Sequence, residues 1–115
     1  MISSKGEEVN FGVVKRDIKM FKFEILRTDG EDFFEGVIIQ QEINKLTLQL
    51  KSLLGEAVYP SKNKLEQKVS RIVDEFGGLI PGQSLYYKDL GTQGVFVMLW
   101  PWKDGQHTTV KIIQR

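Results

Sequence analysis

One histidine, His107, is the side chain in this sequence best suited to carry a proton near neutral pH. Asp104 precedes it by three residues, so a carboxylate could orient the imidazole. Tyr86 and Tyr87 lie in a segment that we expect to pair nearby. This grouping permits a small enzyme or ligand-binding protein with His107 as its proton carrier. A lone histidine beside a turn is ordinarily a solvated loop residue, however, and we predict no catalytic residue and favour a protein that is not an enzyme.

The acidic cluster Asp29, Glu31, Asp32 and Glu35 offers oxygen atoms of the kind that bind calcium. Its spacing does not match the alternating acidic pattern of an EF-hand loop, so we interpret it as a solvated turn. The chain has no cysteine, which removes thiolate nucleophiles and thiolate metal ligands. We therefore expect neither a metal ion nor a cofactor.

The stretch from Val95 to Trp102 is apolar on both faces of the strand that it predicts. Val95, Val97 and Leu99 point one way, whereas the opposite face carries Phe96, Met98, Trp100 and Trp102. Each tryptophan can bury about 200 Å², worth up to ~5 kcal/mol. The aromatic face therefore needs a cover, which could be a helix of the same chain, a second subunit or a ligand. Pro101 lacks a backbone N–H and indicates an edge strand or a bulge.

These observations favour a small binding or regulatory module that forms a homodimer through the aromatic face of a C-terminal sheet. The residues that we predict to bind a partner or ligand are Tyr86, Tyr87, Phe96, Met98, Trp100, Trp102 and His107. The alternative is a pocket for a small molecule lined by the same tyrosines and tryptophans. Both hypotheses place the function at the C-terminal end of the chain.

A third hypothesis is nucleic-acid binding by a basic ridge of Lys64, Lys68 and Arg71 on one helix. Glu66, Asp74 and Glu75 share that segment, and the formal net charge of the chain is only +1. Lysines flanking the apolar stripe of a helix are ordinarily solvated. We therefore do not expect a nucleic-acid partner.

Hydrophobic periodicity predicts an α+β fold with the element order β-β-α-α-β-β-β. Strands are expected at 9–14 and 21–25, joined as a hairpin, and a meander at 85–89, 95–102 and 108–114. Helices are expected at 39–54, ended by Gly55, and from Ser61 as the N-cap to the glycines at 77–78. Residues 33–39 fit either the start of the first helix or a short strand. Both helices should pack on one face of a five-stranded antiparallel sheet.

Composition predicts one domain, 9–115, preceded by a flexible tail, 1–8. Hydrophobic residues make up 41% of the 115 residues and charged residues 27%, as in an ordinary globular protein. No apolar run approaches the length of a transmembrane helix, and the N-terminus lacks the apolar stretch of a signal peptide. We therefore expect a cytoplasmic protein that does not bind membranes.

Overall fold

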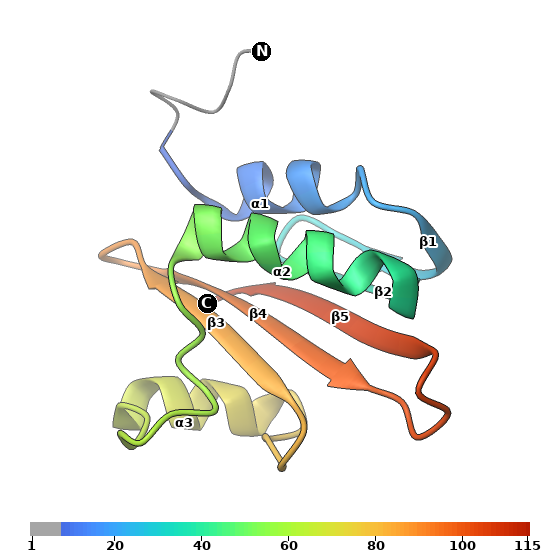
Figure 1. Cartoon of the computed structure of the whole chain (residues 1–115). Coiled ribbons are helices and arrows are strands. Elements are labelled where there is room, and N and C mark those ends of the chain that lie inside the picture. Colours follow the sequence, from blue (N-terminus) through green and yellow to red (C-terminus); the bar gives the residue numbers. More distant parts are fainter. Residues whose placement is uncertain (1–7) are drawn as a thin grey trace.

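A five-stranded antiparallel sheet, with strand order β1-β2-β5-β4-β3, forms the middle of the computed structural model, which describes residues 8–115 (Figure 1). Helices α1 and α2 lie on one side of the sheet and α3 on the other (Figure 1). Of the predicted tail, residues 1–7 fall outside the described part of the chain, and Glu8 is exposed.

The elements are α1 (Phe11–Ile18), β1 (Phe23–Asp29), β2 (Phe33–Ile39), α2 (Gln40–Leu54), α3 (Gln67–Glu75), β3 (Ser84–Asp89), β4 (Gly94–Pro101) and β5 (His107–Gln114). The predicted α+β class with a five-stranded antiparallel sheet is confirmed. The observed order is α-β-β-α-α-β-β-β: the second predicted strand and all elements after it occur in the predicted order, but the first predicted strand is a helix, and residues 33–39 supply the additional strand. No helix described within 8–115 is long and apolar enough to cross a lipid bilayer.

The first predicted strand, 9–14, is wrong, because these residues begin helix α1. Asn10 caps the helix, and its Oδ1 accepts a hydrogen bond from the Val13 N–H at 2.9 Å. Phe11, Val14 and Ile18 recur at spacings of three and four and are buried against the sheet. The hairpin that we predicted between 9–14 and 21–25 therefore does not form. β1 pairs instead with β2.

The segment 33–39, which the sequence left open between helix and strand, is strand β2, and it passes directly into α2. α2 follows the prediction and buries Leu46, Leu50, Leu53 and Leu54. It ends at Gly55, whose φ of 87° is the conformation that a glycine adopts readily.

α3 begins at Gln67 and not near Ser61, so the predicted N-cap is wrong. The Ser61 hydroxyl accepts instead from the Asn63 N–H at 3.2 Å within the preceding loop. Glu66 occupies the N-cap position, and its side chain makes no capping bond. Two helices do share one face of the sheet, but they are α1 and α2, whereas α3 packs on the opposite face.

The alternation of side chains in β4 and β5 creates two apolar cores. Toward α1 and α2 point Val95, Val97, Leu99, Val110 and Ile112. Toward α3 point Phe96, Met98 and Ile113, which pack with Val69 and Val73 of α3. The doubly apolar strand is therefore covered on both faces by helices of its own chain, at least over residues 95–98.

β4 is an interior strand, so the edge position that we inferred from Pro101 is wrong for most of its length. β3 pairs with β4 only as far as Leu99, opposite Ser84. At Pro101 the side of β4 that would face β3 is consequently unpaired, while β5 continues alongside through Thr108. A proline is tolerated there because no neighbouring carbonyl of β3 needs its missing N–H.

Candidate binding face beside the β4–β5 hairpin

α3 covers one end of its sheet face and leaves the other end without a helix (Figure 1). Register places the side chains of β2, β4 and β5 that share this uncovered end. We call it the open face, and it comprises Arg27, Glu35, Trp100, Trp102, His107, Thr109 and Lys111. At this end long side chains lie over the sheet, whereas at the other end α3 covers it.

Trp102 lies at the β4–β5 hairpin end of the open face, directly after the last residue of β4. Its indole N–H donates to the Thr109 hydroxyl at 2.9 Å, which fixes the ring beside β5. The Arg27 guanidinium lies 6.0 Å from the indole ring and the His107 ring 4.8 Å from it. Thr109 is only 5% exposed, whereas Trp102 itself remains half-buried. An ordered, partly exposed tryptophan of this kind is typical of the anchor residues of binding surfaces.

Trp100 lies at the edge of the open face nearest α3, where it packs against the core beneath that helix. The Lys111 Nζ sits 3.6 Å from the ring centroid and donates to the Phe76 carbonyl at 3.3 Å. Burial lowers the pKa of Lys111 below its ordinary value, an effect that nearby Glu35 opposes. Within the described chain the indole N–H of Trp100 is buried without a hydrogen-bond partner. The ring is therefore held by packing and by the lysine rather than by its polar atom.

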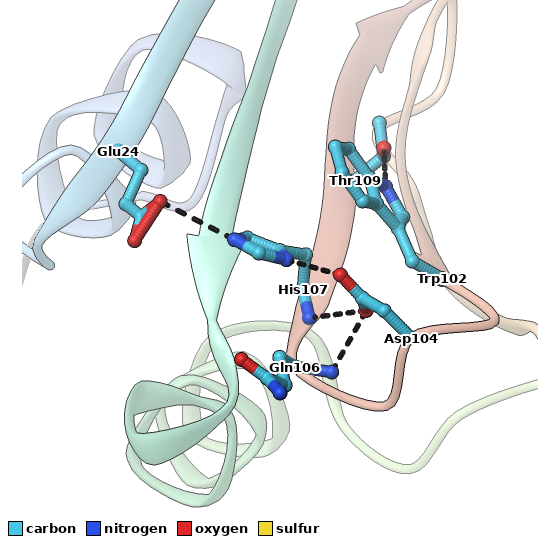
Figure 2. Close-up of polar contacts among 6 residues, drawn as sticks. All are labelled: Glu24, Trp102, Asp104, Gln106, His107 and Thr109. Carbon is cyan, nitrogen blue, oxygen red and sulfur yellow. Dashed lines mark hydrogen bonds and ion pairs between the residues drawn. The ribbon is translucent and has the colours of Figure 1, made fainter.

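His107 is held between two carboxylates (Figure 2). Its Nδ1 lies 2.6 Å from Asp104 Oδ2 in the hairpin turn, and its Nε2 lies 3.3 Å from Glu24 Oε1 in β1. The hydrogen bond to Asp104 is the largest cause that raises the pKa of His107; desolvation opposes it, and the hydrogen bond to Glu24 adds a smaller increase. The histidine therefore connects the β4–β5 hairpin to β1, with a carboxylate oxygen beside each ring nitrogen.

Asp104 also organises the turn that precedes His107. Its Oδ1 accepts from the Gln106 N–H at 2.8 Å and from the His107 N–H at 3.2 Å. The bond from Gln106, and next the bond to the histidine side chain, lower the pKa of the Asp104 carboxyl. This carboxylate is the predicted partner of His107, but it also accepts hydrogen bonds from backbone N–H groups of the turn.

The arrangement does not suit general base catalysis, because neither ring nitrogen is free to accept a proton from a substrate. Among residues 8–115 no group of three or more acidic, histidine or cysteine side chains is arranged to hold a metal ion. What the open face offers instead is flat aromatic surface with charged groups beside it.

The predicted site residues divide into separate environments. Phe96 and Met98 are buried beneath α3, and Tyr86 lies in the core on the opposite side of the sheet. Tyr87 packs on Phe96 with ring centroids 4.7 Å apart, close to α3. Only Trp100, Trp102 and His107 meet at the open face. The tyrosines and tryptophans therefore do not line a common pocket.

Sequence reasoning missed Glu24, Arg27 and Lys111. The sequence carried a signal for Lys111, because period two places it on the face of Ile113 and Thr109. Glu24 and Arg27 come from β1, and their approach depends on β2 pairing with β5. No local pattern could reveal that contact.

The basic ridge is not formed as predicted. Lys64 precedes the first residue of α3, and Lys68 is paired with Asp89 of β3 at 3.0 Å. Arg71 is left as an exposed cation on the helix. These positions do not present a continuous row of cations to a nucleic-acid backbone.

The chain matches no protein-family model, no curated protein and no solved structure. Its function is therefore argued from the geometry alone.

Proposed function

We propose that this protein is a non-enzymatic binding module that forms a homodimer through its open face. The observation that carries the proposal is the pair of half-buried tryptophans, Trp100 and Trp102, on the part of the sheet that α3 leaves without a helix. Tryptophan and arginine are the residue types most enriched among the anchors of protein interfaces. Both occur together here.

Charge favours a second copy of the chain as the partner. Basic groups on or beside the open face are Arg27, Lys111 and His107, and acidic groups are Glu24, Glu35 and Asp104. Arg27 and Glu35 are already paired at 2.9 Å. Because the signs alternate, a two-fold axis through the face can set positive groups of one copy opposite negative groups of the other. A polyanion would meet the carboxylates as well as the cations, which makes it a poorer partner.

The test is the solution mass over a concentration series, measured by size-exclusion chromatography with light scattering. We expect a concentration-dependent dimer. Truncating Trp102 to alanine should raise the dissociation constant at least about tenfold, which corresponds to the loss of one interface anchor of ~1.4 kcal/mol or more. Far-UV circular dichroism would verify that the variant is folded.

The matched control is Leu48→Ala, because Leu48 is an apolar side chain of α2, on the other side of the sheet, and is 67% exposed. This change should leave the dissociation constant unaltered. A wild-type protein that stays monomeric into the millimolar range would refute the proposal. Equal effects of the two truncations would refute the assignment of the open face.

A further inference from the structure

A second candidate site lies away from the open face, where the loop before α3 crosses the helix. Residues 59–65 and α3 enclose a cleft of about 490 Å³. Small-molecule sites commonly have volumes of roughly 300–1,000 Å³. The cleft is therefore large enough for a metabolite-sized ligand.

Part of the lining of this cleft is apolar, and we call this part the floor. It consists of Val73 of α3, which is buried, and of Leu65 and Leu79, which contribute partly buried side chains from the two flanking loops. Such a floor can take the hydrocarbon or ring portion of a ligand, because burying apolar surface is favourable at roughly 25 cal/mol per Å². The floor of the cleft thus favours a ligand with an apolar portion.

Lysines outnumber carboxylates among the residues that line the cleft. Lys62 and Lys64 line it, and neither has a carboxylate partner anywhere in the described range 8–115. Asp74 is the single acidic residue in the lining, so the lysines outnumber it. The next lysine along the chain, Lys68, is by contrast neutralised by Asp89. The Ser70 hydroxyl adds a hydrogen-bonding group from α3.

We propose that this cleft binds a small amphipathic anion, with a carboxylate or phosphate at Lys62 and Lys64 and an apolar body on Val73, Leu65 and Leu79. Charge-assisted hydrogen bonds from lysine suit an anionic head group, and the apolar floor distinguishes the ligand from a simple inorganic ion. A second cavity of about 360 Å³ lies against the same loop and shares Lys64 and Leu65 with the first.

The experiment is a titration followed by two-dimensional amide NMR with three probes: octyl phosphate below its micelle concentration, octyltrimethylammonium and inorganic phosphate. We expect octyl phosphate to shift the amide signals of 61–65, 73 and 79 saturably. Its affinity should exceed that of inorganic phosphate, which lacks the apolar body, and that of the cation, each by roughly tenfold.

The double variant Lys62→Gln, Lys64→Gln should bind octyl phosphate with roughly tenfold lower affinity, since two charge-assisted hydrogen bonds are lost. A matched variant, Lys22→Gln with Lys45→Gln, removes two exposed lysines elsewhere and should change nothing. Equal affinity for the anion and the cation would overturn the proposal. An undiminished affinity in the Lys62 and Lys64 variant, or signal changes centred on Trp100 and Trp102, would overturn it as well.

Discussion

At the scale of single residues, His107 connects two parts of the sheet through its contacts with two carboxylates. Asp104 belongs to the β4–β5 turn and Glu24 to the edge strand β1, so the imidazole joins segments far apart in sequence. Arg27 lies over the Trp102 ring, on which His107 also packs. The two carboxylates beside the ring stabilise its protonated form and raise the pKa of His107.

We predict that the His107 ring titrates above its ordinary pKa of 6.5 in the folded protein. The measurement is the pH dependence of the ring proton signals by NMR, which is unambiguous because the chain has a single histidine. Asp104→Asn should lower the midpoint, and Glu24→Gln should lower it by less, since the Asp104 bond is the larger cause. A midpoint at or below 6.5 in the wild type would contradict the double ion pair.

The same contact predicts how stability depends on pH. The folded pKa of His107 is raised, so its contribution is fully present below the unfolded value, about 6.5, and is lost as pH rises through the folded value. Asp104 has a lowered pKa, so its contribution is present above about 3.8 and is lost as pH falls through the folded value. The difference in melting temperature between wild type and His107→Gln should therefore be largest between pH 3.8 and 6.5, and it should shrink at higher and at lower pH.

At the scale of elements, the end of α3 is shaped by a close approach of Gly77 to Trp100. A Cβ placed on Gly77 would lie 2.6 Å from the Trp100 Cη2 atom, and the residue has a φ of 109°. The glycine thus permits both the helix termination and the packing of the indole. The open face depends on this fit, because it sets the position of Trp100.

We predict that Gly77→Ala destabilises the protein by more than the conformational strain alone. Gly82→Ala is the matched control, since Gly82 has a φ of 94° and nothing within 4 Å of its added Cβ. The control should cost about 1–2 kcal/mol from strain. Gly77→Ala should cost roughly 1–3 kcal/mol more, because the indole must move. Chemical denaturation measures both, and equal losses would contradict the packing argument.

Sequence patterns predicted the elements whose signals are local. α2 shows its leucine stripe and its terminal glycine, and β4 shows an apolar run bounded by turns. The prediction of a strand at 9–14 is wrong because Val9, Phe11 and Val13 alternate as in a strand. A helix of only eight residues is too short for the helical period of 3.6 to be distinguished from the strand period of two. The helix is stabilised by the Asn10 cap and by the burial of Val14 and Ile18. That burial occurs only when the sheet has formed, so it could not be predicted from the local sequence.

The candidate face could be predicted only in part, for the same reason. Trp100, Trp102 and His107 stand out by residue type, and Asp104 is three residues from the histidine. Which aromatic groups stay accessible depends on where α3 docks, and which charges join them depends on β1 reaching the sheet through β2. These are tertiary facts that residue spacing does not encode.

At the scale of the whole molecule, the sheet separates a larger core from a smaller one. The core beneath α1 and α2 takes side chains from two helices, whereas the other is closed by one helix, α3, and by loop residues on either side of it, such as Leu65 and Leu79. α3 spans only nine residues, has no side-chain N-cap and has no acidic residue in its first turn. A short helix lacking these features depends on tertiary packing for its stability. We therefore expect α3 to be released from the fold more easily than the sheet and the larger core.

We predict that α3 opens as a unit while the sheet and the larger core stay folded, which exposes Phe96 and Met98. Native-state hydrogen exchange should give α3 amides a smaller opening free energy than those of β4 and β5. Val110→Ala, in the larger core, should reduce the global free energy by on the order of 2 kcal/mol and leave the opening of α3 unchanged. Val69→Ala, beneath α3, should reduce both quantities equally, because it destabilises only states in which α3 is docked. If Val110→Ala lowers α3 protection as much as that of β5, the helix unfolds only with the whole molecule.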